Sequence, residues 1–155
     1  MYILDTSSIR VLGNYYPDVF PSFWEQLNDA IQRGEIGSVR EVRKELELQD
    51  TSEHVAEWAK LNAAIFLSPT EAEMQIVADI FKVRHFQQLI GEKQRLRGQP
   101  VADPFLVARA GACGGCVVTE EGLKPNAAKI PNVCGHFKIE CIDMKRLLER
   151  FGWRY

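Results

Sequence analysis

Four acidic side chains in this sequence occupy positions from which a folded chain can bring them together. Asp5 directly follows the apolar run "YIL", and Glu121 comes shortly after the apolar run "CVV". Asp103 begins one helical pattern, and Glu45 lies inside another, beside its apolar stripe. Ligands of open parallel sheets bind outside the carboxyl ends of the strands. We therefore expect the four carboxylates to converge in one cleft.

Such a cluster predicts a divalent metal site. Several like charges in one cleft are unfavourable unless a cation compensates them. Oxygen ligands suit Mg²⁺ or Mn²⁺ better than zinc, and bound Mg²⁺ keeps water molecules and takes further contacts from substrate phosphates. The chemistry expected is hydrolysis at phosphorus by an activated water.

Each acid also has a structural interpretation. Asp5, with Thr6 and Ser7, is suited to cap the turn after the first strand. Asp103 precedes a proline and is a good helix N-cap, and Glu45 on a charged helix is typical of solvated surface. The metal hypothesis therefore rests on the joint placement of the acids.

Two neighbouring acids compete for the same roles. Glu41 lies one helical turn before Glu45, but Ser38 and Glu41 have the serine-x-x-glutamate spacing of a capping box. That spacing predicts a helix start at Ser38 and gives Glu41 a structural task. Glu120 competes with Glu121 at the end of the same apolar run.

Short apolar runs alternate with helical patterns along the chain. We expect strands at residues 2–5, 64–67, 116–121 and 137–142, and helices at 22–34, 38–48, 52–63, 68–90 and 101–115 and from 144 after a cap at Asp143. Proline lies near the first turn of the 68–90 helix, and Pro104 takes the first helical position of the 101–115 helix. This order favours an α/β fold of three α/β/α layers with a mostly parallel central sheet. Without repeats or linkers, residues 1–155 form a single predicted domain.

Composition narrows the class of protein. The chain has 155 residues, of which 46% are hydrophobic and 26% charged, and its formal net charge is −2. The net charge gives no overall basic field of the kind that indicates a nucleic-acid partner. No apolar run is long enough to span a bilayer. Asp5 interrupts the first apolar run too early for a secretory signal, so we expect a cytoplasmic protein without a membrane partner.

Four segments resemble a known family in their order and spacing. They are "YILDTSSI", "EVRKEL", "ADPFLVARA" and "VVTEE", and they are similar to the four acidic motifs of PIN-domain ribonucleases, the group that contains the VapC-type toxins. The resemblance covers nearly the whole chain. By position it implies that Asp5, Glu45, Asp103 and Glu121 are the catalytic and metal-binding acids of a PIN-like fold.

The resemblance also implies a function. PIN-like nucleases are Mg²⁺- or Mn²⁺-dependent endoribonucleases specific for single-stranded RNA, often dimeric and often neutralised by an antitoxin. Asp5 and Asp103 would hold the metal, while Glu45 and Glu121 would bind a second ion or orient the attacking water. Thr119, together with Thr6 and Ser7, would hydrogen-bond the ligands or a phosphate oxygen.

One departure from the family pattern concerns the fourth acid. That acid is usually aspartate or asparagine, so the longer Glu121 is open to an outer-sphere role, with Glu120 as its substitute. A catalytically weak PIN-like binding module is therefore the alternative function. An aspartate-nucleophile phosphatase ranks below both, because Ser7 stands where its second aspartate is expected.

Basic and sulfur-containing residues leave two further questions open. Lys93, Arg95 and Arg97 precede the Asp103 helix and are candidates for phosphate contacts, or else form a solvated loop. The "CGGC" segment, with Cys134 and Cys141, has a possible zinc-ligand spacing. The alternative is that the cysteines of the strands are small buried hydrophobes.

Overall fold

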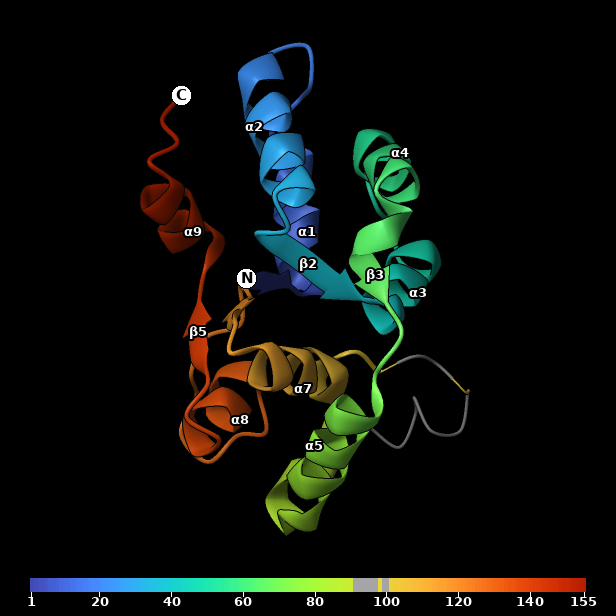
Figure 1. Ribbon diagram of the computed structural model, residues 1–155, viewed down its shortest axis with the longest axis vertical. Helices are drawn as coiled ribbons and strands as arrows, with labels where there is room; N and C mark the ends of the chain where they lie inside the picture. The colour runs from blue at the N-terminus through green and yellow to red at the C-terminus, as the bar shows by residue number, and fades with distance from the viewer. Residues whose placement is uncertain (91–97, 99–100) are drawn as a thin grey trace.

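The sheet is parallel throughout. The computed structural model describes residues 1–90, 98 and 101–155, and within them the strands are β1 (Tyr2–Leu4), β2 (Ile36–Val39), β3 (Phe66–Leu67), β4 (Cys116–Val118) and β5 (Glu140–Ile142). Their order in the sheet is β3-β2-β1-β4-β5, and every neighbouring pair is parallel (Figure 1). The expected α/β class with a parallel central sheet is confirmed.

Helices connect successive strands. The α-helices are α1 (Thr6–Val11), α2 (Pro21–Gln32), α3 (Arg40–Leu48), α4 (Glu53–Leu61), α5 (Glu71–Lys82), α7 (Asp103–Cys113), α8 (Ile130–His136) and α9 (Met144–Phe151). Short 3₁₀ turns, η1 (Leu12–Asn14), η2 (Ala63–Ile65) and η3 (Arg84–Leu89), complete the connections.

The helices form a layer on each face of the sheet, as expected for three α/β/α layers. Helices α1 to α4 and α9 lie on one side, and α5, α7 and α8 lie on the other (Figure 1). This division follows from the strand order, since right-handed crossovers place the helices on opposite faces when the chain reverses its direction across the sheet.

The central strand explains why the first residues are apolar. β1 pairs with β2 on one side and β4 on the other, and Ile3 and Leu4 are completely buried. Strands covered on both faces read as continuous apolar runs. The chain order reverses between β1 and β4, so the carboxyl ends of these two strands form the switch point where ligands of such sheets bind.

The structure corrects the predicted start of the second helix. Ser38 lies in β2 rather than in a capping box, and its hydroxyl donates to the Leu4 carbonyl at 2.7 Å. α3 begins at Arg40 with no side-chain cap. The sheet thus uses the serine hydroxyl to join two parallel strands, an interaction that local spacing does not reveal.

Other boundaries also differ from expectation. The single helix predicted for residues 68–90 ends at Lys82 and is followed by η3, and Pro69 lies before the cap residue Thr70. Asp103 is the first residue of α7 and not its N-cap, which is Ala102. Pro104 is consequently second in the helix.

No helix in residues 1–90 or 101–155 is long and apolar enough to cross a membrane.

Candidate functional site

All four predicted acids line one cavity at the switch point of the sheet. The cavity has a volume of about 180 Å³. Its lining residues are Asp5, Thr6, Ser7, Arg10, Glu45, Gln49, Asp103 and Glu121. The acids come from four separate parts of the fold: the ends of β1 and β4, the middle of α3 and the start of α7. The tertiary structure therefore brings the predicted acids together.

Asp5 is held rigidly as the N-cap of α1. Oδ1 accepts from the Ser8 amide at 2.6 Å, and Oδ2 accepts from the Thr119 hydroxyl at 2.6 Å. The Ser7 hydroxyl lies 2.9 Å from Oδ1 and 2.7 Å from Oδ2. Burial raises the pKa of Asp5, while the hydrogen bonds from Thr119, Ser8 and Ser7 lower it. Asp5 is therefore a cap residue, as the structural interpretation predicted, and the same hydrogen bonds fix its carboxylate at the cavity.

Glu45 reaches across the cavity to two other elements. Oε2 accepts from the Thr6 hydroxyl, and Oε1 accepts from the Ala102 amide at 3.0 Å. The pKa of Glu45 is raised, first by burial and further by the charges of Asp5 and Glu121. The side chain is therefore part of the site and not solvated surface, and it ties α3 to the first residues of α1 and α7.

Asp103 is the acid with the most strongly perturbed ionisation. Burial raises its pKa to about 7, with further contributions from the Glu121, Glu45 and Asp5 carboxylates. Among the residues that the structure describes, no hydrogen-bond donor contacts its carboxylate. The carboxylate oxygens of Asp103 are thus open to a metal ion, whereas those of the neighbouring acids already accept hydrogen bonds from hydroxyl and amide donors.

The two acids that follow β4 point in different directions. Glu121 lines the cavity, while its Oε2 accepts from the Ile130 amide at the start of α8 at 3.0 Å, and Oε1 lies 3.5 Å from Lys129 Nζ. Glu120 instead accepts from the Met144 amide at 2.8 Å, at the start of α9. The structure therefore places Glu121 and not Glu120 beside the other acids.

Glu41 does not join the cavity. Its Oε1 pairs with Arg40 Nε at 2.9 Å, and Oε2 is buried without a partner among the described residues. Glu41 and Glu45 are four residues apart on α3, but only Glu45 lines the acidic cavity.

Arg10 and Gln49 are cavity residues that the sequence did not identify. Arg10 Nη1 donates to Gln49 Oε1 at 3.3 Å, and both side chains line the cavity. Helical spacing offered a signal, because Arg10 lies four residues after the predicted site residue Thr6, and Gln49, the C-cap of α3, lies four residues after Glu45.

The predicted phosphate contacts Arg95 and Arg97, with Lys93, lie outside the described residues.

The donor set fits a hard divalent cation. Four carboxylates around one small cavity mutually disfavour ionisation, as the pKa of Asp103 shows, and a bound cation removes that penalty. Within the described parts of the chain, no three histidine, cysteine or acidic side chains are close enough to hold one ion together. Mg²⁺ commonly takes only one or two protein carboxylates and completes its shell with water and phosphate, so Asp103 with one neighbour meets that requirement.

Comparison with known proteins places the chain in a family. A family model described as a domain of unknown function (DUF4411) matches residues 2–155. The chain belongs to this family. No curated protein sequence matches it significantly. The DUF4411 description names no activity, so function has to be inferred from the site.

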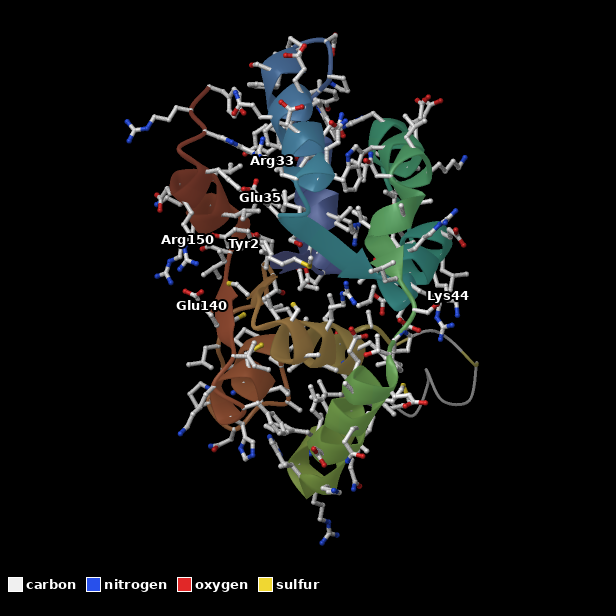
Figure 2. All side chains as sticks on the ribbon, viewed as in Figure 1. Tyr2, Arg33, Glu35, Lys44, Glu140 and Arg150 are labelled. Atoms are coloured by element: carbon white, nitrogen blue, oxygen red, sulfur yellow. The ribbon has the colours of Figure 1, made fainter. Side chains whose placement is uncertain are left out.

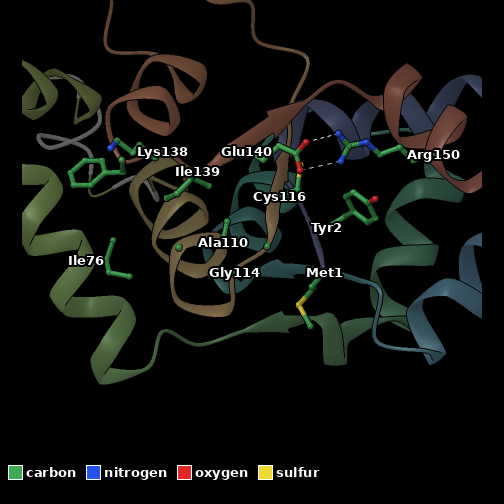
Figure 3. A pocket seen from close by; sticks show the side chains of 13 residues that line it. Met1, Tyr2, Ile76, Ala110, Gly114, Cys116, Lys138, Ile139, Glu140 and Arg150 are labelled. Carbon is green, nitrogen blue, oxygen red and sulfur yellow. Dashed lines mark hydrogen bonds and ion pairs between the residues drawn. The ribbon is translucent and has the colours of Figure 1, made fainter.

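A larger hollow of this DUF4411 chain lies at the other edge of the sheet. It measures about 620 Å³ and is bordered by the amino ends of β1, β4 and β5. Its main charged groups, Glu140 and Arg150, form an ion pair at 2.5 Å (Figure 3). Figure 2 shows this pair near Tyr2, on the side of the molecule that also carries the Arg33–Glu35 pair. Because these charges compensate each other, this hollow lacks the unbalanced acidity of the switch-point cavity.

The cysteines of this DUF4411 chain do not assemble a zinc site in the described structure, in which all four are free. Cys116 and Cys134 are buried, Cys141 lies in β5 and Cys113 ends α7. Burial raises the pKa of Cys116 to about 12. Cys116 and Cys134 therefore pack as small hydrophobic side chains.

Proposed function

We propose that this chain is a divalent-metal-dependent endoribonuclease that hydrolyses phosphodiester bonds of single-stranded RNA. The observation that carries the proposal is the convergence of Asp5, Glu45, Asp103 and Glu121 on one cavity at the switch point of a parallel sheet. Structural caps alone do not account for this arrangement, since the half-buried Asp103 carboxylate accepts no hydrogen bond from the described residues.

The roles of the acids follow from their contacts. Asp103 and Asp5 are the proposed ligands of Mg²⁺ or Mn²⁺, and Glu45 and Glu121 orient water or hold a second ion. When bound, the metal supplies Lewis acidity and lowers the pKa of water. Thr6, Ser7 and Thr119 keep the carboxylates in place through the hydrogen bonds described above.

The choice of RNA rests on the resemblance to PIN-domain nucleases. The same resemblance supports a cytoplasmic toxin of a toxin-antitoxin pair, with an antitoxin protein and a second copy of the chain as partners. Arg10 adds a structural argument, because a cation among the acids reduces the repulsion between the cavity and a phosphate backbone.

The decisive experiment incubates purified protein with total RNA in Mg²⁺, Mn²⁺ or chelator. Asp5→Asn and Asp103→Asn should each reduce cleavage by about a hundredfold or more, since even the loss of a residue behind a metal ligand commonly costs ten- to a hundredfold. Asp79→Asn is the matched control, because Asp79 is an acid on α5 that pairs only with surface groups. Parent-like cleavage by Asp5→Asn would refute the site assignment, and a preference for DNA would refute the substrate class.

The catalytically weak binding module is the second candidate. It is favoured by the engagement of both Glu45 oxygens and of Glu121 with protein donors. Binding of Mn²⁺ by the parent protein, with no cleavage of any RNA in the pool, would support this alternative over the nuclease.

A further inference from the structure

A separate hollow of about 390 Å³ lies between α2 and α4. α2 contributes Trp24, Asn28 and Gln32 to its wall, and α4 contributes His54 and Trp58. The spacing of three or four residues places each set on one face of its helix. The volume is within the range of small-molecule sites, and the proposed metal chemistry makes no use of it.

Aromatic rings form much of this wall. The Trp24 ring centroid lies 5.8 Å from that of His54 and 6.2 Å from that of Trp58, with edge-to-face geometry in both pairs. Trp58 is only 4% exposed, so its position is set by the core. His54 is half-buried, so of these three rings it is the one on which a base can stack, as bases of single strands do on aromatic side chains.

Two polar atoms of the wall lack hydrogen-bond partners. Nε1 of Trp58 and Nε2 of His54 are buried and unpaired within the described part of the chain, whereas Nε1 of Trp24 donates to the Tyr15 carbonyl at 2.7 Å. Unpaired buried groups are unfavourable. A planar ligand with ring nitrogens and carbonyl oxygens offers these two atoms partners, and the Asn28 amide adds a donor and an acceptor beside them.

A smaller hollow adjoins the acidic cavity and reaches the residue before α4. It has a volume of about 210 Å³ and shares Arg10 with the acidic cavity. Its lining also includes Ser52, which directly precedes α4 and stands two residues before His54. A chain of hollows therefore leads from the carboxylates past Arg10 to the beginning of α4.

The charges differ along this route. Among its described lining residues, the hollow between α2 and α4 has no lysine or arginine and one acid, Glu57, so it suits an uncharged base and not a phosphate, and the connecting hollow has Arg10 and Asp50. Arg10 suits a phosphate. A nucleic acid strand would thus meet Arg10 with a phosphate, pass the connecting hollow and place a base in the aromatic hollow.

We propose that the hollow between α2 and α4 is a nucleobase-binding pocket, which receives a base of single-stranded RNA whose phosphate lies at Arg10. The link to the acidic cavity rests on the proposed nuclease function. Binding of the base itself requires no metal.

The first test is NMR titration of the parent protein in chelator, observing the indole N–H signals of its three tryptophans. The probes are AMP, GMP, CMP and UMP, ribose 5-phosphate as the base-free control, and short single-stranded RNA. We expect the Trp58 signal to shift with at least one nucleotide and with RNA, but not with ribose 5-phosphate. The Trp153 signal is the internal control, because Trp153 stacks on Phe151 away from the pocket. Equal shifts with ribose 5-phosphate, or none with any base, would overturn the pocket.

The second test compares affinities for RNA. His54→Ala should weaken binding about tenfold or more, the factor expected from the loss of one base-aromatic contact. His85→Ala is the matched control, since His85 is an exposed histidine outside the pocket. Trp58→Phe keeps a six-membered aromatic ring and removes the pyrrole part of the indole with its unpaired N–H, so it should also weaken binding while the circular dichroism spectrum stays that of the parent. Parent-like RNA affinity in both variants would overturn the proposal.

These outcomes are separable from the nuclease test. RNA cleavage that is unaffected by His54→Ala in both KM and kcat refutes the pocket and leaves the nuclease intact. Base-dependent shifts at Trp58, in a protein that cleaves no RNA, refute the nuclease and leave the pocket intact. A mononucleotide that binds as tightly as RNA overturns the assignment to a strand, because the rest of the strand would then contribute nothing.

Discussion

Asp103 differs from the other acids in how its charge is accommodated. Asp5 and Glu45 each accept hydrogen bonds on both carboxylate oxygens. The described residues donate none to Asp103, whose pKa rises to about 7 through burial and the surrounding carboxylates. The fold therefore holds a carboxylate whose ionised form is disfavoured, at a position where a bound cation would favour it.

Stability should consequently depend on pH through Asp103. Its pKa in the folded protein lies above the ordinary value of 3.8, so between pH 3.8 and about 7 the folded state binds more protons than the unfolded state. The stability contributed by the neutral carboxyl is present below this window and is lost as pH rises through it. Asp103→Asn should then be more stable than the parent by about 2–4 kcal/mol near pH 8 and about equal to it near pH 4.

Urea unfolding at a series of pH values, without divalent cations, measures this difference. Mg²⁺ or Mn²⁺ should raise the stability of the parent and leave that of Asp103→Asn nearly unchanged. Asp79→Asn serves again as the exposed control. A difference between parent and Asp103→Asn that is independent of pH would contradict the assigned ionisation.

At the scale of elements, carboxylates meet the starts of several helices along the edge of the sheet that carries the acidic cavity. Asp5 caps α1, Glu121 accepts from the first amide of α8, and Glu120 accepts from the first amide of α9. Helix amino ends carry unpaired N–H groups and a partial positive charge. The two adjacent glutamates thus point in different directions, because Glu121 binds the start of α8 and Glu120 binds the start of α9.

This separation predicts different consequences for two identical substitutions. Glu121→Gln should lower RNA cleavage about tenfold or more, because it removes a charge from the acidic cavity. Glu120→Gln should leave cleavage at the parent level, since its amide oxygen still accepts from α9. Single-turnover cleavage of one defined RNA compares the two, and a larger loss with Glu120→Gln would show that Glu120 is the fourth acid.

At the scale of the whole molecule, a buried ion pair joins the helix that carries Asp103 to its neighbour. Arg109 Nη1 lies 2.8 Å from Glu73 Oε1, and the two side chains are 14% and 4% exposed. Glu73 also forms the capping box of α5 with Thr70. One carboxylate therefore links the start of α5 to the middle of α7.

Removing one member of this pair should be costly. Arg109→Met leaves the Glu73 charge buried without its partner, so we expect unfolding free energy to fall by about 3 kcal/mol. The double variant Glu73→Gln, Arg109→Met should recover part of that loss. Lys82→Met, which breaks an exposed pair with Asp79, should change stability by less than about 1 kcal/mol. Equal losses for Arg109→Met and Lys82→Met in urea unfolding would refute the role of burial.

Apolar patterning alone predicted much of the sheet and the places where its acids emerge. The runs at Tyr2–Leu4 and Cys116–Val118 are strands because only side chains that tolerate burial on both faces can fill central parallel positions. Asp5 and the acids after Val118 follow directly from those ends. α8 was not predicted, because its pattern of Ile130, Val133 and Cys134 is short and includes both a proline and a glycine.

What sequence by itself determined was therefore local: the apolar strands other than β2, most of the helices and the acids at their ends. Tertiary structure decided which acids meet. Glu45, and not Glu41, lines the cavity, and the Ala102 amide holds its carboxylate there. Glu121 lines the cavity and Glu120 does not, because the first amide of α8 binds Glu121 and the first amide of α9 binds Glu120. Periodicity records the face on which a residue lies, but these donors become neighbours only when the sheet assembles.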